Sequence, residues 1–524
     1  MQPANNLDVT ADTAVDAAVP DTLAQNQERD AGMAIRNKAL QGSVWMIGAT
    51  GAAKALGFAC QLTLAWFLTK EDYGVYAIAI SFSVLLSVLR DGGLPMVLEQ
   101  KANQFDLFAG PVFWMMLAMN VGTGLLIAFL AEPAAKFYHI PELAGVMTLF
   151  AATIPLSVLP SILSVKLAVN LRFRELGLIQ VVSATARNGL LLFFAWAGFG
   201  ARSFLLPVLI TSVTDALLLW MVTRFSPWTL RPRFRLWPEL FADGRWILLG
   251  TFSIAIGNNG AYFVLGQLLS SDVVGTYFFA YQLVVQLGVL LSDNVYQVLA
   301  PSFMRMGPDL ARIRAAVPRA LSVVVLVGAT ASLSIAAIYE PLERALWHGK
   351  WSAATNSVHI LGVIWPAAAA VSVLRALQMA TGHFRQWGIV TFVGAVASIF
   401  GAAVGAYIGG TAGAAAMGFG LGVLLGTALN AAFALPRIGV RALDAATSVL
   451  RPWLILVAAA ACAQYAGALF SRTWIDMLVT AACFCTLGLF ALRLLANDSL
   501  QLFEMSMRQI IRGNFRGTAR GESA

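Results

Sequence analysis

The sequence predicts an all-α integral membrane protein with 14 transmembrane helices, arranged as two parallel six-helix lobes plus two additional C-terminal helices. The chain has 524 residues, of which 59% are hydrophobic and only 12% charged, whereas a soluble protein of this size carries about 25% charged residues. Apolar runs long enough to cross a bilayer core of roughly 30 Å recur along it. The placement of basic residues and an internal repeat then set the number and arrangement of the helices.

The first 34 residues are acidic and poor in apolar side chains. We predict that 1–34 is a disordered cytoplasmic tail rather than a signal peptide, which needs a basic segment followed by an apolar one. The segments that follow are an N-terminal lobe, a basic cytoplasmic linker, a C-terminal lobe, a final helix pair and a basic cytoplasmic tail, over 35–223, 224–245, 246–434, 435–496 and 497–524.

The apolar runs are separated by short connections rich in Gly, Pro, Asp and charge, such as TKEDYG and EPAAKFYHIPE. In chain order the predicted spans are 41–67, 75–98, 108–131, 143–165, 176–197, 203–223, 246–269, 275–299, 320–339, 357–379, 387–408, 411–434, 453–470 and 474–496.

The 35 Lys and Arg residues set the orientation. With the N-terminus in the cytoplasm, 24 of them fall on the inner side, six on the outer side and five within spans. Because cytoplasmic loops of membrane proteins carry the excess of Lys and Arg, we expect both termini to be cytoplasmic. One helix more or fewer would scramble this asymmetry.

A shift of 201 residues carries the first span onto the seventh. It aligns Trp45, Leu68, Gly74 and Tyr76 with Trp246, Leu269, Gly275 and Tyr277. Both spans run outward, so the six-helix lobes are parallel repeats about an axis along the membrane normal. This organisation predicts a transporter that rocks one lobe against the other. On the twelfth span, glycines at a spacing of four predict close helix packing: Gly418, Gly422 and Gly426.

Two basic residues lie deep within predicted spans. Lys54 is about 20 Å along the first span and Arg187 about 17 Å along the fifth, at 1.5 Å per residue. Charges at this depth are costly, face the bundle interior and mark functional sites. For Lys54 the alternative is a structural ion pair with a buried carboxylate. Arg90 and Arg375 lie nearer the inner ends of their spans, where snorkelling to the interface is the alternative.

Other polar residues share this depth. Asp91, Asp215 and Asp293 lie in the inner halves of their spans and could titrate in ion coupling, but we favour a role in pairing with the arginines. In the segment GNNGAY, three side chains could bind a polar ligand or bridge helices, and both interpretations stay open: Asn258, Asn259 and Tyr262.

The central helices are thus predicted to surround a cationic cavity suited to an anionic ligand, because Lys and Arg are the usual partners of phosphate oxygens. The four cysteines lie inside apolar runs without metal-ligand spacing, so no metal or other cofactor is expected. Membrane lipids are expected partners, and nucleic acid is not.

The segment LTKEDYGVYAIAISFSVLLSVLRDGGLPMVLEQ resembles the start of Wzx-type polysaccharide flippases. The matching residues are Leu68, Asp72, Tyr73 and Gly74, then Arg90, Asp91, Gly92 and Gly93. The stretch NLRFRELGLIQVVSATARNGL is similar to the connection between spans 4 and 5 of that family.

The family belongs to the multidrug/oligosaccharidyl-lipid/polysaccharide exporter superfamily. The resemblance implies a transporter, not an enzyme, that moves an undecaprenyl-diphosphate-linked oligosaccharide to the periplasmic leaflet of the bacterial inner membrane by alternating access. Ion-gradient coupling, as well as partners in the polysaccharide polymerase and export machinery, would follow from it. Cavity-lining basic residues hold the diphosphate in such proteins, and here the candidates are Lys54, Arg187, Arg90 and Arg375.

Two other functions stay open. A cation-coupled multidrug exporter of the related group usually has twelve spans and an acidic cavity, whereas the deepest charges here are Lys54 and Arg187. A membrane polysaccharide polymerase or ligase would need long outer loops. The longest predicted one, 340–356, holds Glu340 and Glu343 as its carboxylates.

Overall fold

The computed structural model describes residues 48–91, 93–101, 104–306, 310–470, 473–495 and 501. The predicted tail over 1–34, the start of the first span and nearly all of 497–524 lie outside these residues. For Asp91 and Asp293 the backbone is described and the side chain is not.

Every regular element in the described ranges is helical. A helix over 48–67 comes first. The labelled helices are α2 (Lys70–Asp91), α3 (Leu94–Gln100), α4 (Phe105–Tyr138), α5 (Glu142–Leu156), α6 (Val158–Val169), α7 (Phe173–Trp196), α8 (Leu206–Thr223), α9 (Trp237–Leu268), α10 (Ser271–Arg305), α11 (Leu310–Trp347), α12 (Thr355–Ala380), α13 (Phe384–Gly409), α14 (Ala412–Ala434), α15 (Ala442–Ala468) and α16 (Thr473–Leu495). Short 3-10 turns lie between them at η2 (Gly200–Phe204), η3 (Pro227–Thr229), η4 (Phe234–Leu236), η5 (Ser352–Ala354) and η6 (Pro436–Ile438).

The all-α membrane fold predicted from the sequence is confirmed. Ten helical segments of the described chain are long and apolar enough to cross a membrane. The helix over 48–67 and α2, α9 and α10 occupy the remaining predicted spans. That fourteen helices cross the membrane stays a prediction.

Several helices extend past the predicted spans or break within them, and three of these differences concern the two ends of the bundle and the linker. The second span was expected to be one helix over 75–98, but Gly93 adopts φ 72° and separates α2 from α3. Glycine takes this left-handed conformation without steric cost, and a helix stops there. The predicted outer loop over 340–356 is helical as far as Trp347, and Glu343 is buried, accepting a hydrogen bond from the backbone N–H of Trp351 at 2.8 Å. The seventh helix begins at Trp237 rather than at 246.

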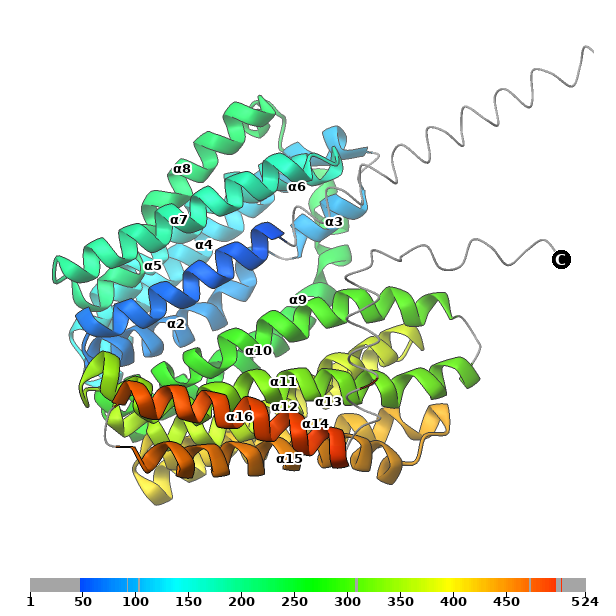
Figure 1. Ribbon diagram of the computed structural model, residues 1–524. Coiled ribbons are helices and arrows are strands. Elements are labelled where there is room, and N and C mark those ends of the chain that lie inside the picture. The colour runs from blue at the N-terminus through cyan, green and yellow to red at the C-terminus, as the bar shows by residue number, and fades with distance from the viewer. Residues whose placement is uncertain are drawn as a thin grey trace, which may run out of the picture.

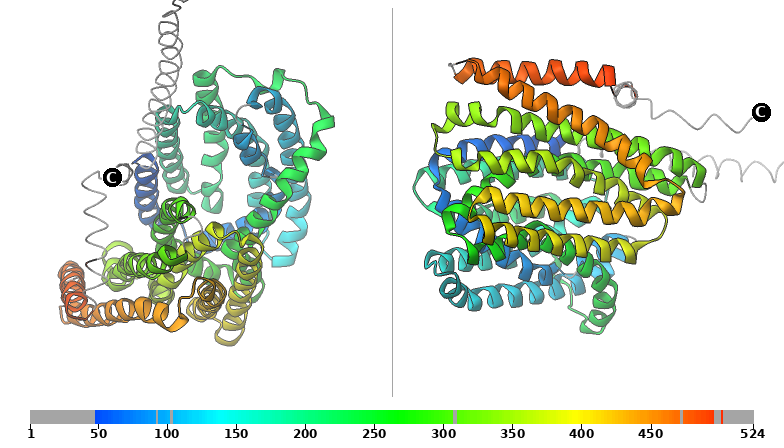
Figure 2. Two further views of the ribbon diagram at one scale, coloured as in Figure 1. Left: turned by 90° about the vertical axis from the view of Figure 1, so that its right-hand side faces the viewer. Right: turned by 90° about the horizontal axis from the view of Figure 1, so that it is seen from below.

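The chain forms two lobes (Figures 1 and 2). We call the helix over 48–67 with α2–α8 the N-lobe and α9–α14 the C-lobe. In Figure 1 the two lobes converge toward the left and spread apart toward the right. The left end, which carries the connections at 68–69, 139–141, 269–270 and 348–354, is called the closed end below, and the opposite end the split end.

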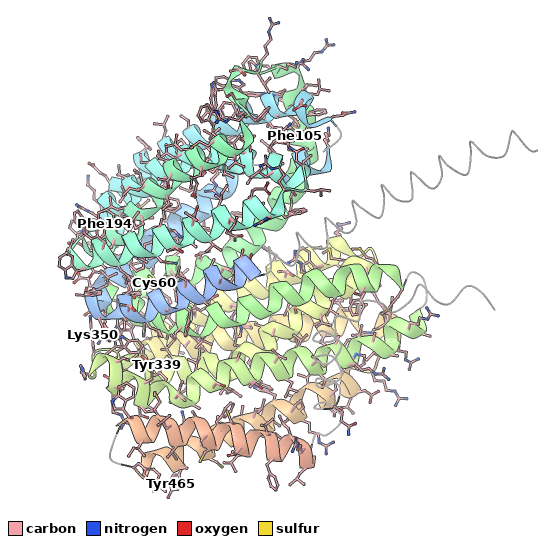
Figure 3. The ribbon with its side chains drawn as sticks, turned by 45° about the horizontal axis from the view of Figure 1, so that its top comes forward. Cys60, Phe105, Phe194, Tyr339, Lys350 and Tyr465 are labelled. Carbon is pink, nitrogen blue, oxygen red and sulfur yellow. The ribbon has the colours of Figure 1, made fainter. Side chains whose placement is uncertain are left out.

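The lobes share one apolar core at the closed end. It joins N-lobe residues such as Leu68, Tyr73 and Ile154 to C-lobe residues such as Tyr277 and Trp351. Figure 3 shows Lys350 and Tyr339 near this end.

At the split end the described residues form two separate cores. The core of the N-lobe, which contains Phe105 and Ile162, includes Leu240 from the start of α9, whereas a different set around Val317 and Leu374 belongs to the C-lobe. Figure 3 places Phe105 at this end. The lobes are therefore joined at one end of the membrane-crossing bundle.

Glycine allows the lobes to approach closely at the closed end. A Cβ on Gly74 would collide with the carbonyl oxygen of Ser271, and one on Gly275 would collide with that of Lys70. The shift of 201 residues exchanges these two contacts, so α2 and α10 cross in the symmetric manner that the repeat predicts.

Within the C-lobe the predicted glycine packing is confirmed. Gly418 lies directly against Gly401, and Gly422 directly against Ser398, so that α13 and α14 touch backbone to backbone. The final pair, α15 and α16, packs on α11 through a separate apolar cluster and lies along the flank of the C-lobe in both views of Figure 2.

Candidate functional site

Arg187 lies on the side of α7 that turns away from lipid. The exposed apolar residues of this helix are Leu178, Val182, Phe193 and Trp196, which fall within about 60° of one another at 3.6 residues per turn. Arg187 is also exposed, yet it lies about 180° from Leu178 around the helix. Its guanidinium therefore points toward other helices of the lobe, within electrostatic reach of Cys60 and Tyr76.

A carboxylate on α8 faces the same way. Asp215 is half-buried and lies about 140° around α8 from the exposed Ile210. The hydroxyl of Ser183, one helical turn from Arg187 on α7, donates a hydrogen bond to Asp215 Oδ1. Arg187 interacts electrostatically with this carboxylate but forms no direct ion pair with a described residue. Its N–H donors remain available.

Lys54 lies on a neighbouring helix of the same lobe, nearer the split end than Arg187. The helix over 48–67 meets α7 where the Cys60 thiol contacts the carbonyl oxygen of Asn188 at 3.6 Å. Since both helices run toward the closed end, Lys54 lies about 9 Å nearer the split end than Cys60. Lys54 is half-buried and makes no hydrogen bond or ion pair with any described residue. The structural ion pair considered as its alternative role is not formed there.

The predicted residues of α9 do not share one environment. Asn258 is exposed, and Asn259 donates a hydrogen bond of 3.4 Å to the carbonyl oxygen of Ala255 in its own helix. Tyr262 is 2% exposed and packs against Tyr277 and other rings of the closed-end core. Of the three, Asn258 is the one placed to meet a ligand.

Arg90 and Arg375 lie on other helices, α2 and α12. Arg90 is half-buried near the split end of α2, where its carbonyl oxygen accepts a hydrogen bond from Asn120 at 2.8 Å. Arg375 on α12 stacks its guanidinium over the ring of Trp387 at 4.9 Å, an arrangement that stabilises a cation beside an aromatic face. Lys54, Arg90, Arg187 and Asp215 thus all lie in the N-lobe, and Arg375 lies in the C-lobe.

A family model described as polysaccharide biosynthesis protein matches residues 63–356. The chain belongs to this family.

Named relatives of this polysaccharide biosynthesis protein are similar over most of their length. It is 23% identical to the succinoglycan biosynthesis transport protein ExoT of Rhizobium meliloti (strain 1021), over 69% of the chain and 73% of that protein. It is 21% identical to the lipopolysaccharide biosynthesis protein WzxC of Escherichia coli (strain K12), over 63% of the chain and 68% of that protein.

Solved structures share its fold. The inward closed conformation of the lipid II flippase MurJ matches with a TM-score of 0.67 at 13% identity, covering 87% of this chain and 99% of that one. An inward-facing MATE family transporter of the MOP superfamily matches with a TM-score of 0.56 at 12% identity, covering 74% and 94%. The chain therefore shares the fold of these proteins.

Sequence reasoning missed a second polar cluster in this polysaccharide biosynthesis protein, at the closed end. Trp347, Lys350 and Trp351 of the C-lobe donate hydrogen bonds to backbone carbonyls of the N-lobe helix over 48–67. The segment ALWHGKWSAA, with two tryptophans and a lysine within five residues, is the signal that could have indicated it.

Proposed function

We propose that this protein moves a diphosphate-linked, lipid-anchored oligosaccharide across the bacterial inner membrane by alternating access. Membership of the polysaccharide biosynthesis protein family supports this, as do relatives named for succinoglycan transport and lipopolysaccharide biosynthesis. The observation that carries it is the pair Lys54 and Arg187, two cations in mid-helix that have no direct anionic partner among the described residues. Such a pair is suited to the diphosphate of the substrate.

The phosphates, the sugars and the lipid chain of the substrate would each meet different surroundings. Phosphate oxygens accept charge-assisted hydrogen bonds from Arg and Lys, and Arg187 and Lys54 supply several donors at two depths. The sugars need polar neighbours, which Ser183, Asp215 and Asn258 offer. The polyprenyl chain is as apolar as the bilayer and can stay in lipid while the head group crosses.

The split end would face the cytoplasm and the closed end the periplasm. With the split end on the cytoplasmic side, the 24 Lys and Arg assigned to the inner side from the sequence would satisfy the positive-inside rule. Both termini would then be cytoplasmic. The structure would be the state that accepts substrate, and release would require the closed end to open and pass the product to polymerase and export machinery.

Secondary roles follow for the other polar residues. Asp215 would hold the Arg187 guanidinium in the bundle when no phosphate is bound, and would be a candidate for ion coupling. Arg90 and Arg375 would guide the anionic head group near the split end. Asp91 and Asp293 would offset these charges.

The decisive test is complementation of a deletion strain. Cells lacking the protein should accumulate lipid-linked oligosaccharide in the cytoplasmic leaflet, where it is shielded from a glycan-modifying enzyme added to spheroplasts. Lys54→Ala and Arg187→Ala should each lower export about tenfold or more, since each removes charge-assisted bonds to phosphate worth about 1.5–3 kcal/mol. Lys54→Arg should retain much of the activity because it keeps the charge.

Lys136→Ala is the matched control, since this exposed lysine lies at the closed end of α4, away from the two cations. Membrane levels of all variants must be equal. Normal export by both alanine variants would exclude the diphosphate site. Intact polysaccharide export in the deletion strain, together with increased sensitivity to cationic drugs, would instead favour a multidrug exporter.

A further inference from the structure

The closed end is held by donors of one lobe that bond to backbone acceptors of the other. From the C-lobe, Trp347 Nε1 donates to the carbonyl oxygen of Leu62 at 3.1 Å, and Trp351 Nε1 donates to that of Ala65 at 3.0 Å. From the N-lobe, the Tyr138 hydroxyl donates to the carbonyl oxygen of Phe263 at 2.9 Å. The shift of 201 residues carries Leu62 onto Phe263, so both lobes present an acceptor at the same position of the repeat.

Lys350 adds a contact to one side of this arrangement. Its ammonium donates to the carbonyl oxygens of Ala65, Trp66 and Leu68 at 3.0, 3.1 and 2.7 Å. An ammonium has three N–H donors, and all three find an acceptor here. The carbonyls of Ala65 and Trp66 belong to the last turn of the helix over 48–67, and that of Leu68 follows directly after it. Intrahelical donors are missing there, and the helix dipole favours a cation.

The surroundings of Lys350 fix the position of its side chain. The residue is half-buried, and burial lowers the pKa of its ammonium, whereas the Asp72 carboxylate raises it in part and Lys70 lowers it. Glu343 fixes the loop by accepting the backbone N–H of Trp351, and the ring of Trp351 stacks on Phe279 at 4.1 Å. The ammonium is thus delivered by a rigid part of the C-lobe.

We propose that Lys350 is the latch of the closed end: its ammonium clamps the end of the first N-lobe helix to the C-lobe and must leave these carbonyls before that end opens. This inference rests on the alternating access of the proposed function. The N-lobe turn over 139–141 is shorter than the C-lobe connection over 348–354, so the latch is an addition to one repeat rather than part of the symmetric crossing.

Opening can be measured without following transport. Ala77 on α2 is fully buried in the closed-end core, so Ala77→Cys, in a variant whose four native cysteines are replaced by alanine, reports access to that core. Spheroplasts are treated with a membrane-impermeant maleimide, and inverted vesicles are treated in parallel. Lys350→Met should raise the labelling rate from the spheroplast side about tenfold or more, because at least one charge-assisted bond is lost.

Lys350→Gln should raise labelling similarly and Lys350→Arg much less, since only the latter keeps a cation. Lys136→Met removes a lysine from an exposed position near the same end and should leave labelling unchanged. Equal melting temperatures in detergent show that the variants are folded. Labelling of both Lys350→Met and Lys350→Gln at the rate of the parent would overturn the latch, whatever the export assay shows. Loss of export in Lys54→Ala with unchanged labelling in Lys350→Met would leave the proposed function standing and remove the latch alone.

Discussion

Arg187 and Lys350 are two cations with opposite surroundings. The Lys350 ammonium donates to three carbonyl oxygens, whereas Arg187 is exposed and has the Asp215 carboxylate within electrostatic reach. The first arrangement satisfies every donor and stabilises a contact. The second leaves donors for a ligand, as a binding site requires.

The hydrogen bond from Ser183 to Asp215 is the contact that holds the carboxylate on the inner side of α8. Ser183→Ala should destabilise the protein by about 1 kcal/mol, the size of an interhelical hydrogen bond in a membrane protein. Thermal unfolding in detergent measures this. Ser212→Ala is the control, because the Ser212 hydroxyl bonds to Val208 in its own helix. Equal losses for the two variants would show that the α7–α8 bond contributes nothing.

At the scale of helices, contact between α13 and α14 depends on missing side chains. Gly401 and Gly418 touch through their backbones, and Gly394 faces Gly426 in the same way. Close backbone approach of this kind is how membrane helices associate without a hydrophobic driving force. The glycine spacing on the twelfth span predicted the packing but not its partner, because the residues of α13 that complete it are read only from the fold.

Gly418→Ala should therefore separate these helices and lower the free energy of unfolding by about 2 kcal/mol, as overpacking does. Gly388→Ala on α13 is the control, because a Cβ there meets no other atom within 4 Å. It should be neutral or slightly stabilising, since alanine favours a helix over glycine. Unfolding by titration with a denaturing detergent compares the two. A Gly418→Ala variant as stable as the parent would show that the helices can move apart freely.

At the scale of the whole molecule, one crossing joins the lobes symmetrically. Gly74→Ala and Gly275→Ala should each force α2 and α10 apart at the closed end, since each added methyl group meets a backbone carbonyl of the other helix. With Ala77→Cys as reporter, both should raise labelling by a similar factor, about tenfold for a cost near 1.4 kcal/mol. Gly51→Ala, where a Cβ meets nothing, should not. Opposite effects of the two substitutions would contradict the symmetric crossing.

The sequence predicts the architecture well, because burial in lipid imposes it: apolar run length, alternating basic loops and the 201-residue repeat all reflect the bilayer. It also points to Lys54, Arg187 and Asp215, since charges in apolar runs are conspicuous. It misses the break at Gly93 and the extension of α11 to Trp347, where the hydropathy of the segment does not change. The contacts that hold the closed end cannot be predicted from the sequence for a different reason. Their acceptors are the carbonyls of Leu62, Ala65 and Leu68, which any residue would carry.

Because the acceptors at the closed end are backbone carbonyls, substitutions on the two sides of this contact should have unequal effects. Replacing Leu62 or Ala65 by another helix-forming residue of similar size leaves every acceptor in place, whereas a single change at Lys350 removes three bonds at once. Tolerance to substitution should therefore be broad along the end of the first helix and narrow at the loop that meets it.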